Sequence, residues 1–439
     1  MDPKTLENFV PWFRASAPYI HAFGGRTFVI AFGGEVVADG SIVGLTHDLN
    51  LLAALGVKLV LVHGARPQIE ERLRARDADI RYVRDMRVTD EAAMQDVKEA
   101  SGRLRMEIEA LLSVGLPSTP MANATIQVTS GNFVVARPVG VVDGVDMMFT
   151  GEVRKIRADA IRRCLDDEDV VLVPPLGYSP TGEIFNLTLE DVAAQTAIAL
   201  KADKLLFLMD EPGIVTAEGE VRNELTVSEA DRLLGEGSAV QGDGALYLPF
   251  ATRACRGGVN RVHMVSRHVD GALLLELFTH SGIGTMVTQD PVEQLRQATI
   301  EDVGGILQLI EPLEADGTLV KRSRELLEIE IDRFIVLQHD DRIVGCAALY
   351  PFEADRAVEL ACLAVHPDHR NGGAGERLLQ FIEAKARRSG YQRLFVLTTR
   401  TAHWFVEQGF AEVPVADLPP QRQQFYNYQR RSKVLVKAL

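Results

Sequence analysis

The sequence predicts an α/β protein of two domains, a parallel sheet with helices on both faces followed by a smaller domain whose sheet is mostly antiparallel. Three observations support this prediction. The chain has 439 residues, more than one domain usually holds. Short apolar runs alternate with longer amphipathic runs from residue 27 to about residue 285, which is typical of parallel strands joined by helices. Later, strand-like runs follow one another directly, which favours antiparallel strands.

The composition narrows the classes of function. Hydrophobic residues make up 46% and charged residues 25%, which suits a globular protein with a full core. The net charge of −14 argues against a nucleic-acid partner, because binding phosphates requires concentrated positive charge. No apolar run approaches 18 residues and no signal peptide is recognisable, so we expect a cytoplasmic protein with no membrane partner. The four cysteines form no close pair, so we expect reduced thiols and no metal site.

The helices and strands of the first domain are predicted from apolar runs and from the glycine and proline residues at their ends. The first strand ends at Gly33-Gly34, the first helix ends at Gly56, and Pro67 lies in the first turn of the next helix, where its missing N–H costs little. The expected strands are 27–32, 58–64, 169–177, 204–210 and 259–266, and the expected helices are 44–56, 67–77, 189–202 and 271–282.

The second domain opens with an amphipathic segment after residue 297. Residues 334–367 contain three expected strands, separated by turns at Asp340-Asp341 and at 353–356. A helix from Glu376, a strand at 392–399, a short helix at 402–408 and a strand at 432–439 complete it. We place the domains at 1–285 and 295–439, with a linker at 286–294.

A glycine-rich loop follows the third of these strands, which ends at Val365. Its sequence is Arg370-Asn371-Gly372-Gly373-Ala374-Gly375, and the next helix begins near Glu376. Backbone N–H groups at a helix N-terminus suit a phosphate, glycine lets the backbone approach it, and an arginine adds a forked donor. The glycines alone would also fit an ordinary turn.

The strands, the loop, the following helix and Gly409-Phe410 occur in the order seen in the GNAT acyltransferase superfamily, which residues 295–439 resemble. The family motif falls on Arg370, Gly373 and Gly375. The resemblance implies a GNAT α/β domain in which the loop binds the pyrophosphate of acetyl-CoA. The implied contacts are Leu363, Ala364, Val365, Arg370, Asn371, Gly372, Gly373, Ala374, Gly375 and Glu376.

The first domain, in "FVIAFGGEVV" and "LVLVHGARPQIEERL", resembles the amino-acid kinase fold, especially acetylglutamate kinases. A lysine of that family is replaced by Ala31, its glycine run becomes Gly64-Ala65-Arg66, and Glu190 stands at the position of an aspartate. The lysine neutralises charge during phosphoryl transfer, which alanine cannot do. The resemblance therefore implies a catalytically inactive kinase scaffold, although an active kinase with unusual residues stays open.

A second group of residues in this domain resembles the effector site of arginine-inhibited kinases. The resemblance implies an arginine pocket lined by Tyr19, His268, Glu276, Gly282 and Gly284. A carboxylate can bind a guanidinium through two hydrogen bonds, which is the role implied for Glu276. By itself, Glu276 would also fit a solvated helix position.

Together the two halves resemble the bacterial N-acetylglutamate synthase family along essentially the whole chain. The resemblance implies transfer of acetyl from acetyl-CoA to the α-amine of L-glutamate, inhibition by L-arginine, and a homo-oligomer, with a hexamer favoured. A GNAT enzyme for another amine and a non-catalytic arginine sensor are the alternatives.

Glutamate carries two carboxylates, so its pocket needs at least two cationic or amide donors. We expect Arg322 to bind one carboxylate and Arg431 the other, with Ser432 and Lys433 assisting and Cys362 lining the pocket. Arg324 and Arg430, which lie in the same basic segments, are interpreted as surface charges.

The attacking amine must be neutral, so a base or a water chain must remove its proton. We expect Glu359 to act through water, although an outward-facing strand glutamate is the alternative. A backbone N–H near Leu363 or Ala364 is the expected donor to the oxyanion. Many GNAT enzymes carry a tyrosine where this chain has Phe405, so Thr398 or a water is the expected acid.

Overall fold

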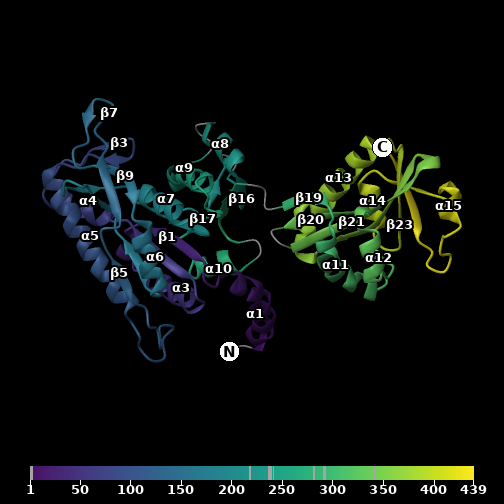
Figure 1. Ribbon diagram of the computed structural model, residues 1–439, viewed down its shortest axis with the longest axis horizontal. Helices are drawn as coiled ribbons and strands as arrows, with labels where there is room; N and C mark the ends of the chain where they lie inside the picture. Colours follow the sequence, from purple (N-terminus) through teal and green to yellow (C-terminus); the bar gives the residue numbers. More distant parts are fainter. Residues whose placement is uncertain are drawn as a thin grey trace. The chain divides into compact units, whose positions relative to one another are not determined.

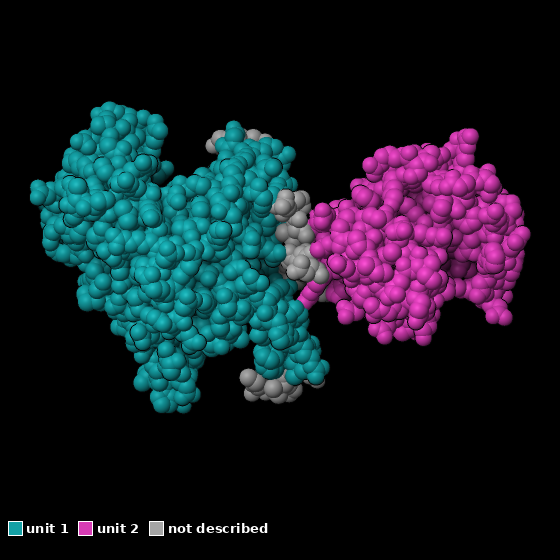
Figure 2. Space-filling model, viewed as in Figure 1, with its two compact units in different colours: residues 1–290 teal, residues 291–439 magenta. Residues whose placement is uncertain are grey.

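The computed structural model describes residues 3–216, 219–235, 240, 242–279, 282–289, 293–339 and 342–439, with the side chains of 3–8, 368, 371 and 372 left outside the description. Figure 2 shows that the chain forms two compact units, residues 1–290 and 291–439. In the described part, no helix is long and apolar enough to cross a membrane.

Unit 1 is built on an eight-stranded sheet in the order β16-β18-β17-β13-β1-β2-β10-β5. Neighbouring strands are parallel except for β17 and β18. The expected parallel sheet is therefore confirmed, with one antiparallel pair near its edge. The strands are β1 (Thr27–Phe32), β2 (Lys58–His63), β5 (Val128–Ser130), β10 (Val170–Val173), β13 (Lys204–Met209), β16 (Glu224–Thr226), β17 (Arg261–Ser266) and β18 (Thr285–Thr288).

Helices cover both faces of this sheet (Figure 1). Alternate residues of each strand point to opposite faces, so Val29 and Ala31 join one core while Phe28 and Ile30 join the other. The first core includes α6 (Ala158–Asp166), α7 (Leu189–Leu200), α8 (Val227–Gly235) and α9 (Gly242–Arg256). The second includes α3 (Ile42–Ala54), α4 (Arg66–Ala75), α5 (Glu91–Leu112), α10 (Ala272–Phe278) and the end of α1 (Pro3–Phe23), and the short helix α2 (Glu35–Ala38) adds Val36 to it.

The sequence analysis did not anticipate the smaller sheets of unit 1. One has four strands in the order β12-β11-β6-β9, and three two-stranded sheets accompany it. Most of these strands have only two or three residues, too few to show a clear alternation. They are β3 (Tyr82–Val83), β4 (Met86–Arg87), β6 (Val134–Pro138), β7 (Val141–Val142), β8 (Val145–Asp146), β9 (Gly151–Ile156), β11 (Leu176–Tyr178), β12 (Ile184–Asn186), β14 (Ile214–Val215) and β15 (Val221–Arg222).

Unit 2 is built on a seven-stranded sheet in the order β19-β20-β21-β22-β23-β25-β24. Only the pair β22 and β23 is parallel within this sheet, which confirms the mostly antiparallel arrangement. Its strands are β19 (Glu293–Gln297), β20 (Phe334–His339), β21 (Arg342–Phe352), β22 (Ala357–Val365), β23 (Arg393–Thr398), β24 (Ala411–Val413) and β25 (Lys433–Ala438).

Two pairs of helices sandwich this second sheet (Figure 1). One face packs on α13 (Ala374–Arg388) and α14 (Ala402–Glu407). The other packs on α11 (Val303–Ala315) and α12 (Arg324–Ile329). A short helix, α15 (Pro420–Gln423), follows β24, and five 3₁₀ turns complete the unit: η1 (Ile300–Asp302), η2 (Ile331–Arg333), η3 (Glu353–Asp355), η4 (Pro367–Gly372) and η5 (Val415–Asp417).

The structure shortens the linker that we expected at 286–294. Strand β18 runs to Thr288 and pairs with β17, and strand β19 begins at Glu293 and pairs with β20. The helix expected over 271–282 ends at Phe278, and residues 280 and 281 lie outside the described residues, as does the expected turn at Asp340-Asp341.

A β-bulge interrupts β22 at Cys362. Cys346 of β21 lies opposite Ala364 and Ala348 lies opposite Ala361, so Cys362 and Leu363 together face one residue of β21. Cys362 accordingly adopts φ of +53°. The bulge reverses which face each side chain occupies: Leu360 packs on the α13 side, whereas Cys362 packs on the α11 side.

Candidate functional site

The glycine-rich loop joins β22 to α13 as the sequence predicts. Its backbone forms the 3₁₀ turn η4, and Gly373 caps α13 with φ of +72°, a left-handed conformation that favours glycine. Arg370 closes the loop, since its Nε donates to the carbonyl of Val365 at 3.1 Å. Helix α13 begins at Ala374, two residues before the expected start, which leaves Glu376 in its first turn. The side chains of Asn371 and Gly372 lie outside the described part.

The absence of a side chain at Gly375 leaves space for the ring of Trp404. A Cβ on Gly375 would lie 3.3 Å from the ring of Trp404, which packs edge-to-face on Phe405 at 4.9 Å. Phe405 is buried in the core between α13 and the sheet. The position at which many GNAT enzymes carry a tyrosine is therefore a core position in this protein.

Strands β22 and β23 separate next to this loop. Their parallel pairing ends at Leu360 and Val396, although β22 continues to Val365 and β23 to Thr398. Leu363 and Ala364 therefore lie on a stretch of β22 that has a strand partner on one side only among the described residues. Backbone groups at such a position can donate to a ligand between the strands.

Glu359 lies in β22 on the N-terminal side of the bulge and is 8% exposed. Both of its carboxylate oxygens accept hydrogen bonds from Arg422 of α15, with Nε 2.6 Å from Oε2 and Nη2 3.0 Å from Oε1. Each oxygen keeps a further lone pair that can accept from water. Sequence reasoning missed Arg422, which is 63 residues away and has no pattern that links it to the strand.

Arg322 belongs to the same face of the sheet as Cys362. Burial opposes its charge, but the neighbouring Cys362 and Tyr350 raise the pKa of the Arg322 guanidinium. The thiol of Cys346 and then Arg322 lower the pKa of Cys362, against the effect of burial. Tyr350 lies opposite Glu359 across β21 and β22. A half-buried cation, a thiol and the strand carboxylate thus lie around one region of the sheet.

The two basic segments meet, but through an arginine that we expected to be a surface charge. Arg430, which is partly exposed, donates through Nη2 to the carbonyls of Thr318 at 2.5 Å and Gly317 at 3.2 Å, so this surface charge also has structural partners. Arg324 is a surface charge as expected, in an exposed pair with Glu328 of the same helix.

The remaining residues of this site have other contacts. Arg431 is exposed and has φ of +51°, and the carbonyl of Ser432 accepts from the Tyr426 hydroxyl at 2.6 Å. Lys433 pairs with Glu412 at 2.8 Å, and both side chains are more than half exposed. The Thr398 hydroxyl lies 2.9 Å from that of Thr401 and accepts the Thr401 backbone N–H at the start of α14. These contacts give Lys433 and Thr398 structural partners away from the strand carboxylate.

Unit 1 contains a pocket of about 870 Å³ at the ends of β1 and β2, lined by Gly33, Arg66 and Glu190 among others. A Cβ on Gly64 would lie 3.2 Å from Cα of Gly33, so the two loops approach closely at this glycine. Ala31, in the strand before them, is fully buried between Val62 and Phe207. Burial raises the pKa of Glu190.

Glu276 is part of a buried polar chain rather than a solvated helix face. Its Oε1 accepts from His263 Nδ1 at 2.6 Å, and its Oε2 accepts the N–H groups of Ile283 at 2.7 Å and Gly284 at 2.9 Å. Burial alone would raise its pKa, but His263 and these N–H groups lower the pKa of Glu276 to about 2.

Lys204 extends this chain beyond His263. Burial, and then the charge of Lys204, lower the pKa of His263 to about 4. A neutral His263 donates from Nδ1 to Glu276 and accepts at Nε2 from Lys204, which lies 3.1 Å away. The Lys204 ammonium also lies over the ring of Phe23, which is a ring neighbour of Tyr19 on α1. Tyr19 is thus brought to this chain through Phe23.

Both glycines of the turn after α10 are required by its geometry. Gly282 has φ of +60°, and a Cβ there would lie 2.5 Å from Glu276 Oε2. A Cβ on Gly284 would lie 2.2 Å from the carbonyl of Met264. The turn therefore closes tightly around the Glu276 carboxylate.

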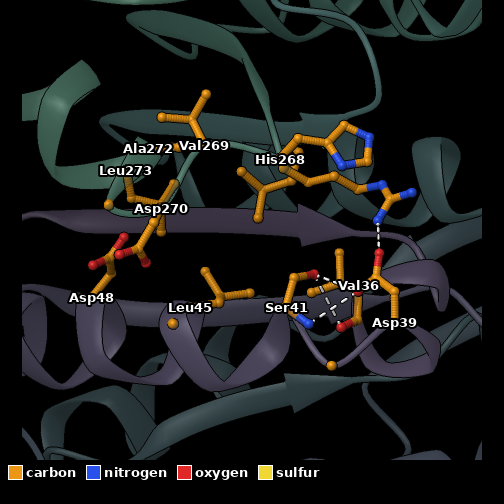
Figure 3. Close-up of a pocket in the computed structure, with 15 residues that line it drawn as sticks. Val36, Asp39, Ser41, Leu45, Asp48, His268, Val269, Asp270, Ala272 and Leu273 are labelled. Atoms are coloured by element: carbon orange, nitrogen blue, oxygen red, sulfur yellow. Dashed lines mark hydrogen bonds and ion pairs between the residues drawn. The ribbon is translucent and has the colours of Figure 1, made fainter.

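His268 does not join this chain. Its imidazole contacts Asp210 at 3.2 Å and lines a separate pocket of about 500 Å³ between α3 and residues 267–273 (Figure 3). His263 lies beside Glu276 and Lys204 lies on the other side of His263, and sequence reasoning missed both because each lies in an apolar strand. A buried histidine within a strand is the signal that could have identified one of them.

The fold and the site define an acyltransferase unit of GNAT type joined to a unit of amino-acid kinase type. Residues 26–266 match the amino acid kinase family, and residues 330–412 match the acetyltransferase (GNAT) domain. The chain is 55% identical to the amino-acid acetyltransferase of Ralstonia nicotianae over 100% of this chain and 97% of that one. It is 53% identical to that of Azotobacter vinelandii over 99% and 100%. The chain belongs to the amino-acid acetyltransferases and is an acyltransferase.

Solved structures extend the comparison to full length. N-acetylglutamate synthase from Neisseria gonorrhoeae, complexed with coenzyme A and L-arginine, is 39% identical, with a TM-score of 0.89 over 98% of this chain and 99% of that one. The same enzyme complexed with coenzyme A and N-acetyl-glutamate gives a TM-score of 0.64 over the same shares.

Proposed function

We propose that this protein transfers the acetyl group of acetyl-CoA to the α-amine of L-glutamate and that L-arginine inhibits the reaction. The relatives are named amino-acid acetyltransferases, and the full-length structural match is an N-acetylglutamate synthase crystallised with coenzyme A and L-arginine. The structural observation that carries the proposal is the bulge at Cys362. The buried carboxylate of Glu359 precedes the bulge in β22, the open strand edge at Leu363 and Ala364 follows it, and the glycine-rich loop begins after the end of the strand.

The loop fits the pyrophosphate of acetyl-CoA. Gly373 has no side chain at the N-terminus of α13, where backbone N–H groups favour an anion. Arg370, at the surface beside it, supplies positive charge. The thioester would then lie along Leu363 and Ala364, where β22 has separated from β23 and a backbone N–H can stabilise the developing oxyanion.

Glu359 is the proposed base. A water held on its carboxylate would accept the proton of the glutamate ammonium, while Arg422 fixes the direction of the carboxylate. The departing thiol has an ordinary pKa near 8.5 and needs little assistance, so water is as suitable a proton donor as Thr398. The contacts of Thr398 with the start of α14 favour water.

Arg322 is the proposed partner of one substrate carboxylate, because it is half-buried on the face of the sheet that holds Cys362. Arg431 is the proposed partner of the other. Arg430 supports this by joining the segment of Arg431 to the loop that precedes Arg322. The pair of Lys433 with Glu412 does not favour the assisting role expected for Lys433.

Arginine would bind in unit 1 at the chain of Lys204, His263 and Glu276. A buried ionised carboxylate suits a guanidinium, and the turn at Gly282 surrounds that carboxylate. Unit 1 would act as the sensor and not as a kinase, since Ala31 leaves the phosphate site without its lysine.

A homo-oligomer and a cytoplasmic location complete the proposal. Phe9, Trp12 and Phe13 of α1 are each about half exposed, which suits contact with a second copy of the chain. We favour a hexamer. The described cysteines are all free, which agrees with a reducing compartment.

One assay tests the function. The purified full-length chain is mixed with acetyl-CoA and each common amino acid, and thiol release is followed with and without arginine. We expect release with glutamate and suppression by arginine. Release with another amine would identify a different acceptor, and no release with any amine would indicate a sensor without acetyltransferase activity.

A further inference from the structure

Three side chains from separate elements converge at the edge of the second sheet. Glu293 begins β19, His339 ends β20 as its register partner, and His369 belongs to the turn η4 of the glycine-rich loop. Their candidate ligand atoms all lie within 4.8 Å of one another, and the described residues contain no other such group of three. The function proposed above does not use this cluster.

The separations of these atoms suit a shared ion. Glu293 Oε1 lies 3.7 Å from His339 Nδ1 and 3.6 Å from His369 Nδ1, longer than ordinary N–H···O hydrogen bonds. With metal–ligand bonds of about 2.0–2.2 Å, a tetrahedral zinc ion holds its ligand atoms roughly 3.3–3.6 Å apart. An ion between the three groups therefore requires only a small adjustment.

The surroundings hold the ligands in place. Arg377 of α13 binds the other carboxylate oxygen of Glu293, so Oε1 is the oxygen that faces the imidazoles. The rings of His339 and His369 pack edge-to-face with centroids 5.1 Å apart, and the backbone N–H of His369 donates to the His366 carbonyl at 3.0 Å, which fixes the turn that carries His369. A hydrogen-bonded carboxylate such as that of Glu293 is typical of the ligands in metal sites.

Access to the cluster is partial. The side chain of His369 is 7% exposed, that of His339 18% and that of Glu293 23%. Three protein ligands with one side open to solvent leave a position for a water molecule. Two nitrogen ligands and one carboxylate favour zinc, cobalt or nickel over calcium and magnesium, which prefer oxygen.

We propose that Glu293, His339 and His369 bind a divalent transition-metal ion of the zinc class, with water as the fourth ligand. The ion would tie the loop at 367–372 to β19 and β20. Because that loop is the proposed acetyl-CoA site, metal occupancy would lower the KM for acetyl-CoA. This kinetic effect rests on the proposed function, whereas metal binding does not. Our expectation of no metal site rested on the cysteines. It did not consider Glu293, His339 and His369, which are separated by 46 and 30 residues in the sequence.

The test is a titration of the chelator-treated full-length chain with Co²⁺, followed by its visible ligand-field absorption. We expect one equivalent to bind with a four-coordinate spectrum and Zn²⁺ to displace it. His369→Gln and His339→Gln should each weaken binding at least tenfold. The control is His403→Gln, since His403 is 89% exposed and outside the cluster.

The absence of a saturable band in the native chain, or an unchanged band in both cluster variants, would overturn the proposal and leave a metal-free polar cluster. Thermal unfolding shows whether each variant folds. If His369→Gln does not fold, the spectra of His339→Gln and of the native chain decide whether the cluster binds the metal. Metal binding without any change in the KM for acetyl-CoA would refute the loop-clamping role, and an assay with no acetyltransferase activity would refute the proposed function alone.

Discussion

Arg422 holds both carboxylate oxygens of Glu359, at 2.6 and 3.0 Å, across 63 residues of sequence. Glu359 is buried and the Arg422 side chain is 22% exposed, so the pair is shielded from most of the solvent. The guanidinium fixes where the carboxylate points, which a base acting through one water molecule requires. The pair therefore has both a structural and a catalytic role in our proposal.

Glu359→Gln should lower kcat about 100-fold with little change in the KM for acetyl-CoA, because the amide keeps the shape but cannot accept the proton. Steady-state kinetics at saturating acetyl-CoA measure this. Glu407→Gln, on the surface of the same unit, is the control and should retain full activity. A kcat for Glu359→Gln within twofold of the native value would remove Glu359 from the mechanism.

Arg422→Ala should destabilise unit 2 by about 3 kcal/mol, because it leaves a buried carboxylate without its partner. Thermal unfolding of the full chain, followed together with kcat, measures the effect. Arg324→Ala, which breaks only an exposed pair, should change stability by less than about 0.5 kcal/mol. Equal effects of the two substitutions would contradict a buried role for Arg422.

Arg322→Ala should raise the KM for glutamate more than tenfold and leave that for acetyl-CoA unchanged, since a half-buried cation that binds a substrate carboxylate is costly to remove. Initial rates over a range of glutamate concentrations measure this. Arg324→Ala, two residues along the chain, again serves as the control. If the two arginines behave alike, Arg322 does not bind glutamate.

Gly373→Ala should raise the KM for acetyl-CoA about tenfold, because a methyl group would stand where the phosphate approaches the backbone. Gly390→Ala is a matched control: both glycines are left-handed, with φ of +72° and +84°, and they lie at opposite ends of α13. Both variants carry similar backbone strain, so only a ligand at Gly373 separates their kinetics. A similar rise in the KM for acetyl-CoA in both variants would show that backbone strain alone causes the effect.

Gly282→Ala should abolish inhibition by arginine and preserve kcat, because its Cβ would lie 2.5 Å from the Glu276 carboxylate. Gly258→Ala provides the comparison, since Gly258 is also left-handed and has open space around it. The arginine concentration for half-inhibition should rise at least tenfold in the first variant only. Normal inhibition of Gly282→Ala would place the effector elsewhere.

Asp48 predicts a pH dependence of stability. Burial, and then repulsion from Asp270, raise the pKa of Asp48 from 3.8 to about 6, and Figure 3 shows the two carboxylates facing each other. The folded state thus keeps this proton at pH values where the unfolded chain has lost it. Stability from this group therefore falls as pH rises from about 4 to about 6.

Asp48→Asn should remove that fall and stabilise the protein by about 2–3 kcal/mol at pH 7. The measurement is thermal unfolding of both proteins between pH 4.5 and 8, taken as the difference between variant and native chain. Asp79→Asn, at an exposed position, is the control for the loss of one surface carboxylate. A constant difference for Asp48→Asn across this range would contradict an ionisation effect.

Local patterns predicted most of the fold. Long apolar runs such as those of β1, β2 and β13 occur where a strand is buried on both faces, and a glycine directly follows β1 and β2. The short strands of the four-stranded sheet lack such runs, because their packing depends on partners distant in sequence. Likewise, the extent of α10 depended on the turn that closes on Glu276, which helical periodicity does not show.

The sequence predicted the contiguous parts of the candidate site, but it did not predict the contacts between residues far apart in the chain. The loop from Arg370 to Gly375 is contiguous, so its geometry follows from its own residues. Arg422, Lys204 and His263 reach their partners only through the tertiary fold, and Arg430 was taken for a surface charge for the same reason. His268 lies close to Glu276 in sequence but contacts Asp210 instead.

The extra residue at Cys362 makes the length of β22 as important as its composition. If the same residues alternated strictly, without the bulge, Ala364 would face α13, whereas the structure packs Ala364 on the α11 side. Deleting Leu363 would remove the bulge and turn Cys362 toward α13, while Ala364 would stay opposite Cys346 on the α11 side. We therefore expect deletion of Leu363 to disturb the site around Cys362 far more than conservative replacements at 361–364 do, a contrast that the kinetics of the two kinds of variant would reveal.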